Sequence, residues 1–234
     1  MTSHGTILGT VAELHRHPVK SLTGERLGRL RLDSRGVVGD RLWAVTDPDG
    51  KLGSGKSSRR FRRMEGLLGV RAEYDGDVPV LTFPDGQVLR GDDPAVHQAL
   101  SDHVGRPVTL AREDRVSHFD EGPVHLVATA SLDTIGEQRG GGVDARRLRP
   151  NIVVQAGLSE EQWEGRRIAV GDEVVLQVLY AMPRCVMLDL PTVDLPADGG
   201  LLRTVTEVNA GCLGVVADVV SPGTVSLGAP VTLA

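Results

Sequence analysis

The sequence predicts a mainly β chain of the α+β class, with a barrel-like sheet and a few short helices on its outside. Short runs rich in β-branched residues recur from one end of the chain to the other, and turn signals separate them. Only two segments carry helix signals. At 234 residues, the chain can bury a core as one large β domain or as two intertwined small ones.

The predicted elements follow from these local signals. The turns Asp47-Pro48-Asp49-Gly50 and Phe83-Pro84-Asp85-Gly86 separate strands, as expected for hairpins. Helices are predicted from Asp93, a natural N-cap, through residue 102, and over residues 131–138. The predicted strands are 6–14, 25–32, 40–46, two runs within 73–89, 124–129, 151–155, 173–179, 215–220 and 223–233.

The composition argues against several classes of protein. A net charge of −5 and a pI near 5.8 are unlike those of a nucleic-acid-binding domain, which is usually basic. Two cysteines, Cys185 and Cys212, are too few for a disulfide framework or an all-cysteine metal site. No window approaches the ~18–20 apolar residues of a membrane span, and the N-terminus has no apolar leader. We therefore expect a cytoplasmic monomer with no nucleic-acid or membrane partner.

One stretch, residues 147–185, concentrates groups with binding chemistry. It contains two predicted strands, and if these strands pair, both ends of the stretch converge at one sheet edge. Arg149, Asn151, Arg184 and Cys185 then lie together, offering guanidinium groups to an anion and a thiolate to a metal or an electrophile. These residues alone leave open a simpler alternative, a salt-bridged sheet edge beside a buried thiol.

Two further segments gather positive charge. Residues 15–21, HRHPVKS, follow the first predicted strand and place Lys20 and Ser21 in a turn that suits an anion, although such side chains are usually only solvated. Residues 56–63, KSSRRFRR, hold five cations in eight residues. In an acidic chain this second segment is either a solvated face, which is the default, or a loop that faces a phosphate.

Six short motifs stand in a definite order along nearly the whole chain. They are Pro18-Val19-Lys20-Ser21, Gly39-Asp40-Arg41-Leu42-Trp43, Arg149-Pro150-Asn151-Ile152-Val153, Trp163 with Ile168-Ala169-Val170-Gly171-Asp172, Pro183-Arg184-Cys185, and Pro222-Gly223-Thr224-Val225-Ser226-Leu227-Gly228. Each motif is weak alone, but together they resemble the MOSC family preceded by its N-terminal β-barrel domain. The resemblance implies a mixed-sheet β-barrel, and we predict the N-terminal domain over residues 1–92 and the MOSC domain over residues 93–234.

The resemblance also implies a function. The family binds molybdenum cofactor (Mo-molybdopterin) and reduces N-hydroxylated small molecules, and pyridoxal phosphate binding is a further family-level property. Cys185 matches the family's protein ligand to molybdenum, a soft centre that a thiolate suits, and its guanidinium neighbours would favour the ionised thiol. Since the chain has no four-cysteine cluster motif and no flavin or nicotinamide fingerprint, a separate redox protein must supply electrons. The positions that match cofactor contacts are Lys20, Ser21, Arg41, Gly122, Arg149, Asn151 and Arg184, whose cations suit a phosphate.

This chain departs from the family pattern around the pocket. Glu121-Gly122-Pro123 replaces a small hydroxyl pair before the proline, so a carboxylate enters and one polar contact is in doubt. Beyond Cys185 an apolar segment beginning at Met187 replaces the usual sequence, which puts the rim in doubt. Cys212 is either a second active-site thiol or, more in keeping with free cysteines, buried filler. Two rival functions stay open: a sulfur carrier with a persulfide on Cys185, and a binding module that has lost its cofactor.

Overall fold

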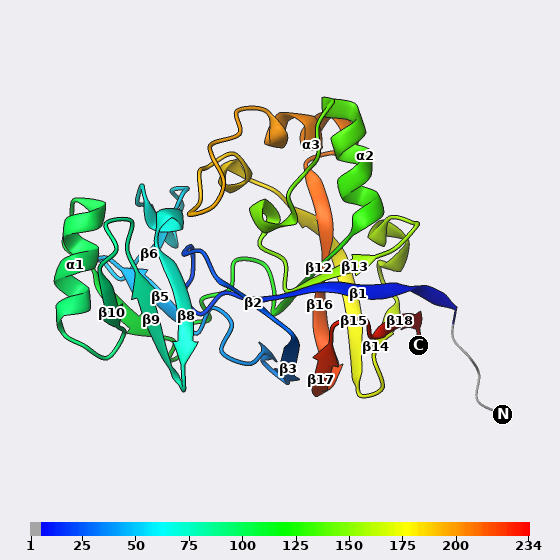
Figure 1. Ribbon diagram of the computed structural model, residues 1–234, viewed down its shortest axis with the longest axis horizontal. Coiled ribbons are helices and arrows are strands. Elements are labelled where there is room, and N and C mark those ends of the chain that lie inside the picture. Colours follow the sequence, from blue (N-terminus) through cyan, green and yellow to red (C-terminus); the bar gives the residue numbers. More distant parts are fainter. Residues whose placement is uncertain (1–5) are drawn as a thin grey trace.

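A closed barrel of seven strands forms the larger part of the computed structural model, which describes residues 6–234 (Figure 1). The strands follow one another around the barrel in the order β13-β12-β16-β15-β14-β18-β1, and β1 pairs with β13 to close it. Among the barrel strands within residues 6–234, only β12 and β13 pair in parallel, so the predicted mixed-sheet β-barrel is confirmed. The strands are β1 (Ile7–Arg16), β12 (Val124–Ala128), β13 (Ile152–Gln155), β14 (Arg167–Val170), β15 (Val174–Pro183), β16 (Cys212–Ser221) and β18 (Pro230–Leu233), and β2 (Glu25–Leu27) extends the sheet from β1.

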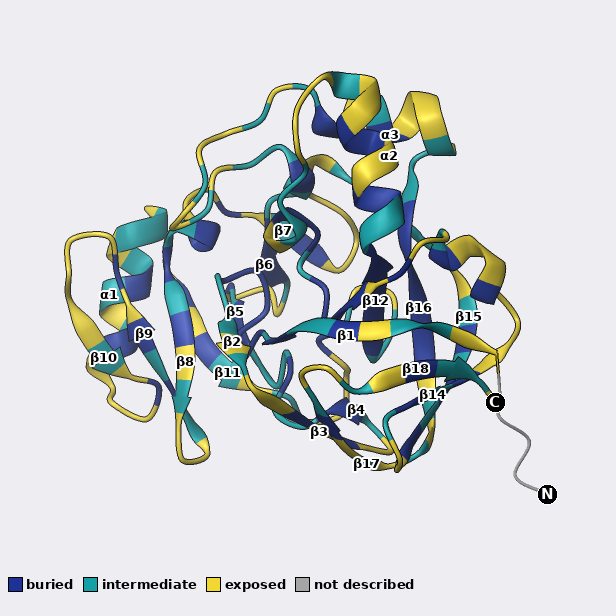
Figure 2. Ribbon diagram, turned by 45° about the vertical axis from the view of Figure 1, so that its right-hand side comes forward, coloured by how far each residue is buried: buried dark blue, intermediate teal, exposed yellow. Residues whose placement is uncertain are grey.

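A smaller unit lies beside the barrel and is built from two open sheets. One sheet has the order β11-β5-β6-β7 and the other β10-β9-β8. Helix α1 packs against them around a core of its own, separate from the core inside the barrel (Figure 2). The elements are β5 (Trp43–Thr46), β6 (Leu52–Ser54), β7 (Phe61–Arg63), β8 (Arg71–Asp75), β9 (Val78–Thr82), β10 (Val88–Arg90), α1 (Ala95–Val104) and β11 (Thr109–Arg112).

The two units are intertwined along the chain. The N-terminal strand β1 closes the barrel, although most of the next hundred residues build the smaller unit. A third small sheet joins β3 (Arg29–Asp33) and β4 (Gly36–Val37) to β17 (Gly223–Ser226) near the other end of the chain. The division after residue 92 stays a prediction; in the structure, α1 and β11 pack with the smaller unit.

Within residues 6–234, three α-helices cover the outside of the two units. Asp93 caps α1 as expected, its carboxylate accepting from the Ala95 amide at 2.9 Å, and α2 (Thr129–Arg139) matches the second predicted helix. The sequence did not indicate α3 (Leu201–Asn209), which has no side-chain N-cap and carries helix-weakening Thr and Val residues. No helix within residues 6–234 is long and apolar enough to cross a membrane. Short 3-10 helices occupy Leu67–Gly69, Ala145–Leu148, Glu160–Trp163 and Val186–Leu188.

One expectation about pairing is wrong. The strands predicted at 151–155 and 173–179 exist as β13 and β15, but β12 and β16 lie between them. Their ends still converge, because the end of β15 and the segment before β13 open at the same end of the barrel, where Arg184 Nη1 donates to the carbonyl of Leu148 at 3.0 Å. Barrel closure rather than direct pairing therefore brings the ends of this stretch together.

Candidate functional site

A cavity between the barrel and the smaller unit collects most of the predicted site residues. The loop after β1, the turn before β5, the segment before β13 and the end of β15 all reach it. Six of the predicted residues line this cavity: Lys20, Ser21, Arg41, Arg149, Arg184 and Cys185. The two others, Asn151 and Gly122, do not line it.

The backbone around the cavity is held in an uncommon conformation. Ser21, Arg41 and Arg149 have positive φ angles of 63°, 50° and 55°. Among residues 6–234 the only other non-glycine residue with positive φ is Ala210. Such conformations cost free energy and persist where the surrounding structure enforces them, often at functional sites. The strain falls on residues that the sequence had already assigned to cofactor contacts.

Arg41 is fixed at the cavity by a buried acid. Its guanidinium pairs with the carboxylate of Asp40, which is fully buried, and Arg41 Nη2 donates to the carbonyl of Arg149 at 3.1 Å. The other carboxylate oxygen of Asp40 accepts from the His17 amide at 2.7 Å. Asp40 therefore ties the end of β1 and Arg41 into one arrangement.

Lys20 is a buried cation on the wall of the cavity. Its side chain is 2% exposed, and Nζ donates to the carboxylate of Asp120 at 2.6 Å. The same ammonium lies over the ring of Phe61 at 4.5 Å from the ring centroid. Burial lowers the pKa of Lys20 to about 8, despite the opposing effect of Asp120. The ammonium is thus poorly solvated and suited to bind an anion.

Arg149 has an unused donor at the cavity. Its Nη1 donates to the carbonyl of Leu22, whereas its Nη2 is buried and has no hydrogen-bond partner. Burial and the nearby charge of Arg41 lower the pKa of Arg149 to about 9. Buried donors are normally satisfied, so an unsatisfied guanidinium nitrogen indicates a place for an acceptor that the chain does not supply.

Arg184 positions the segment that carries Cys185. Its Nε donates to the carbonyl of Leu213 at 2.7 Å, and its Nη2 lies 2.5 Å from Nε2 of His125. Burial lowers the pKa of Arg184 to about 9, and burial together with Arg184 keeps the pKa of His125 well below its ordinary value. Because most donors of Arg184 are used within the chain, its main effect is to hold the backbone before Cys185.

The two thiols lie at the adjoining ends of neighbouring strands. Cys185 follows β15, is half-buried and lines the cavity. Cys212 begins β16, where it is the register partner of Pro183, and it is also half-buried. Cys212 therefore lies close to the segment that carries Cys185. It does not line the cavity, whereas Cys185 does.

The two predicted residues outside the cavity have structural contacts. Asn151 is 1% exposed; its Oδ1 accepts from the His125 amide at 3.1 Å and its Nδ2 donates to the carbonyl of His15 at 3.3 Å. A side chain on Gly122 would meet Val216, since an added Cβ would lie 2.3 Å from its Cγ1. Their roles as cofactor contacts stay predictions.

The cavity also has charged lining residues outside the predicted set of cofactor contacts. Asp120 was missed, because nothing local to it signals a partner 100 residues away. Lys56 belongs to the basic segment whose default interpretation was a solvated face, but it lines the cavity. Glu121, expected as an intruding carboxylate, lines the cavity too.

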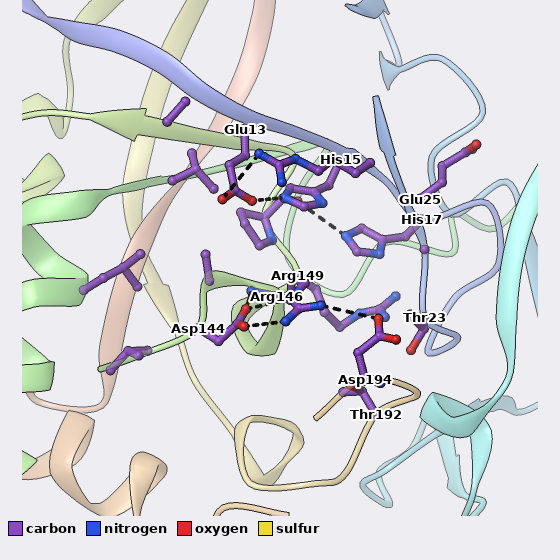
Figure 3. Close-up of a pocket in the computed structure, with 18 of the residues that line it drawn as sticks. Glu13, His15, His17, Thr23, Glu25, Asp144, Arg146, Arg149, Thr192 and Asp194 are labelled. Carbon is purple, nitrogen blue, oxygen red and sulfur yellow. Dashed lines mark hydrogen bonds and ion pairs between the residues drawn. The ribbon is translucent and has the colours of Figure 1, made fainter. Parts of the chain in front are cut away.

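The cavity itself is small, and two larger spaces lie beside it. It holds about 70 Å³ and shares Ser21 and Met187 with a groove of about 390 Å³ lined by apolar side chains that include Met64, Leu67 and Leu190. On the other side of Arg149 lies a polar cavity of about 610 Å³, whose wall carries the Arg146–Asp144 ion pair and the buried His17 (Figure 3). A ligand larger than a simple anion would extend from the small cavity into one of these spaces.

The donor set fits a cofactor that brings its own metal. Within residues 6–234, no three His, Cys, Asp or Glu side chains gather to hold a metal ion. The cavity instead offers a single thiol beside a surplus of cations, with an unpaired buried donor on Arg149. A thiolate suits a soft metal and convergent cations suit a phosphate, so these residues fit an anionic metal cofactor.

The family models match the two parts of the chain. Residues 8–118 match the MOSC N-terminal beta barrel domain, and residues 113–232 match the MOSC domain. The chain belongs to the MOSC family. The resemblance inferred from the six motifs is therefore confirmed.

Curated relatives are distant. Mitochondrial amidoxime-reducing component 1 of Mus musculus is 25% identical over 80% of this chain, and Mitochondrial amidoxime reducing component 2 of Bos taurus is 24% identical over 77%. Molybdenum cofactor sulfurase of Oryza sativa subsp. japonica is 24% identical over 74% of this chain. The chain spans 66% of the length of the two amidoxime-reducing components and 27% of the sulfurase.

A solved structure shares the fold. The YUAD protein from Bacillus subtilis superposes with a TM-score of 0.52 over 97% of this chain and 96% of that protein. At 15% identity the likeness concerns the fold alone.

Proposed function

We propose that this chain is an oxidoreductase that binds molybdenum cofactor and reduces N-hydroxylated compounds, with Cys185 as the protein ligand to molybdenum. The observation that carries the proposal is the meeting of Cys185 with Lys20, Arg41 and Arg149 in one cavity. The family and the names of the amidoxime-reducing relatives support it.

The cations would hold the cofactor by its phosphate. Lys20 and Arg149 pay a desolvation cost that lowers the pKa of each, and a phosphate dianion would offset that cost. Arg41 is already oriented by Asp40, so it would bind without a large loss of side-chain entropy. When bound, the cofactor supplies a metal that accepts and donates electron pairs.

The thiol of Cys185 would fix the metal end. Its segment is held by Arg184, whose Nε and Nη1 donate to carbonyls on two other segments. A rigid ligand position favours one metal geometry, and the soft sulfur matches molybdenum better than a carboxylate would. The apolar groove that shares Ser21 and Met187 with the cavity gives room for the body of a substrate.

The reaction requires an outside electron source. Reduction of an N-hydroxy group takes two electrons and two protons, breaks the N–O bond and releases the amine or amidine together with water. The two cysteines of this chain do not provide a four-cysteine cluster. A separate redox protein is therefore part of the proposal.

Two other functions use the same residues differently. In a sulfur carrier, Cys185 would hold a persulfide, an idea that the name of the sulfurase relative favours. In a binding module, the cavity would bind an anion without redox chemistry.

One experiment separates the three functions. The chain is produced in a host that makes molybdenum cofactor, and the purified protein is analysed for molybdenum, pterin and sulfane sulfur. About one molybdenum per chain, with viologen-driven reduction of benzamidoxime, is the expected result. Labile sulfane sulfur without metal would favour the carrier instead, and the absence of metal, pterin and sulfane sulfur would favour the module.

A further inference from the structure

Three cations surround one aromatic ring at the wall of the cavity. Phe61 of β7 is buried, and the ammonium of Lys20 lies 4.5 Å from its ring centroid. The ammonium of Lys56 lies at 5.2 Å and the guanidinium of Arg60 at 5.4 Å from the same centroid. Lys20 and Lys56 line the cavity, whereas Arg60 is exposed. The ring therefore links the cavity to the outer surface.

A basic surface begins at Arg60 and continues away from the cavity. Arg60 donates to the carbonyls of Ser117 and Phe119, which bring the 113–120 loop against the 56–63 segment. Between these segments lies a surface hollow of about 510 Å³. Its lining includes five cations, which we call the basic face: Lys51, Arg59, Arg60, Arg112 and Arg115.

The charge of the basic face is largely uncompensated. The nearby Arg62 is neutralised by Asp47 and Asp49, but within the described part of the chain no member of the basic face forms an ion pair with a carboxylate. Asp49 and Asp114 are the acidic residues of the hollow. A concentration of free cations in a chain of net charge −5 produces a positive potential that is local to this side of the molecule.

We propose that the basic face docks an acidic electron-transfer protein, which delivers electrons to the cavity past Phe61. The inference rests on the proposed reductase function and names the surface and the charge of its partner. A one-electron donor would be oxidised in each of two encounters, and together these supply the two electrons that cleavage of the N–O bond consumes. The position of the face beside the cavity wall, and not its charge alone, carries the assignment.

The composition of the face favours a protein over a nucleic acid. Val116, which is 66% exposed, lies among the cations, and Asp114 interrupts them. An exposed apolar residue within a charged rim is typical of a protein interface. A nucleic-acid site would instead present an uninterrupted basic track. Complexes between electron-transfer proteins have small interfaces and form by electrostatic steering. A cluster of five cations around one hollow suits such an interface.

Charge reversal on the face provides the test. The double variant Arg59→Glu/Arg115→Glu removes two cations that do not line the cavity. The matched control is Arg166→Glu/Arg167→Glu, which makes the same charge change at exposed positions beside β14, on the far side of the barrel (Figure 1). The probe is a reduced plant-type [2Fe–2S] ferredoxin, an acidic one-electron carrier, and methyl viologen serves as a small donor that needs no docking surface.

We expect the face variant to raise the KM for ferredoxin at low salt by about tenfold or more relative to the control, with the difference shrinking at ~0.5 M salt. Viologen-driven turnover should be equal in the two variants.

An equal KM for ferredoxin in the face variant and the control would overturn the docking surface. Calorimetry that finds ferredoxin binding insensitive to salt would overturn it as well. Tighter binding of a single-stranded oligonucleotide than of ferredoxin, lost in the face variant, would also overturn it. An absence of viologen-driven turnover in the unaltered, cofactor-loaded chain would instead count against the reductase, while calorimetry still decides on the surface.

Discussion

Lys20 and Asp120 form a short ion pair, 2.6 Å between Nζ and Oδ1, on the wall of the candidate site. The lysine is almost fully buried, whereas the aspartate side chain is 36% exposed. The ion pair with Asp120 only partly offsets the cost of burying the ammonium, because burial still lowers the pKa of Lys20 to about 8. Asp120 thus holds one donor of the Lys20 ammonium, and under the proposed function a bound phosphate would compete with it.

The lowered pKa of Lys20 predicts that the residue destabilises the cofactor-free chain. The unfolded chain holds this proton more tightly, so the cost is complete below pH ~8 and disappears as the pH rises toward the ordinary lysine value near ~10.5. Lys20→Met should therefore raise the free energy of unfolding of the cofactor-free protein at pH 7 by about 1–3 kcal/mol. Denaturant unfolding at pH 7 and at pH 10 measures this gain, which should be smaller at the higher pH.

Lys51→Met is the control for that prediction, because Lys51 lies outside the cavity. It should leave the unfolding free energy unchanged at both pH values. In protein made with cofactor, Lys20→Met should lose pterin even though the chain is more stable. A Lys20→Met variant that is less stable at pH 7 would show that the Asp120 pair outweighs the cost of burial.

The cavity cations should differ in their effect on cofactor retention. We expect Arg41→Ala and Arg149→Ala each to lower pterin and molybdenum content more than Lys56→Ala does. Arg149 holds an unpaired buried donor, and Arg41 is fixed by Asp40. Lys56 lies on the mostly exposed basic segment, where its ammonium lies over the Phe61 ring and forms no ion pair within the described residues. Pterin fluorescence after oxidative release and metal analysis provide the ranking.

Folding must be separated from binding in the Arg41 variant, because alanine leaves the buried Asp40 without its partner. Such a loss costs about 3–5 kcal/mol. Arg41→Lys keeps the charge and serves as the second variant, with thermal stability measured beside cofactor content. Equal occupancy in the Arg41, Arg149 and Lys56 variants would contradict the ranking, and loss of cofactor from Lys56→Ala alone would make the basic segment the phosphate clamp.

Asn151 matches a cofactor contact by motif, but in the structure it is buried and does not line the cavity. Its amide joins the His15 carbonyl to the His125 amide. Asn151→Ala should lower the unfolding free energy by about 1–3 kcal/mol, since buried polar groups lose their partners. Cofactor content should fall only in proportion to the loss of folded protein. Loss of cofactor at unchanged stability would show a direct contact that requires Asn151 to move.

The fold and most of the cavity could be predicted from the sequence, because they depend on local signals and on the order of the motifs along the chain. Alternating strands, the turn at Gly50 and the Asp93 cap need only neighbouring residues, and each is confirmed. The motifs likewise brought Lys20, Arg41, Arg149 and Cys185 to one place, as the cavity lining shows.

What the sequence missed depends on distant contacts. The pairing of Lys20 with Asp120 joins residues 100 positions apart. The positive φ of Ser21, Arg41 and Arg149 is imposed by packing, since none of these residue types favours it. β13 and β15 do not pair, because β15 pairs with β14 and β16, although the ends of β13 and β15 meet. Helix α3 is stabilised by burial of Leu201 and Val205 rather than by its own propensity.

The two cysteines distinguish the proposed reductase from its rivals. Cys185→Ser should abolish N-hydroxy reduction and leave the fold intact, because a serine oxygen is nearly isosteric with the thiol but harder and far less acidic. Pterin content should outlast activity, since Lys20, Arg41 and Arg149 would still hold the phosphate. Full reductase activity in Cys185→Ser would remove the central claim about this site.

Cys212→Ser is the matched variant, a second half-buried thiol on the neighbouring strand that does not line the cavity. We expect it to keep most of the activity. Since the thiol is half-buried and not fully buried filler, its replacement by a hydroxyl should cost no more than about 1–2 kcal/mol of stability. Cys212 is the register partner of Pro183, only two residues before Cys185, so the two thiols belong to adjacent segments. Comparable loss of turnover in both variants at unchanged thermal stability would therefore favour persulfide or disulfide chemistry, whereas loss confined to Cys185→Ser would leave metal ligation as the role of that thiol.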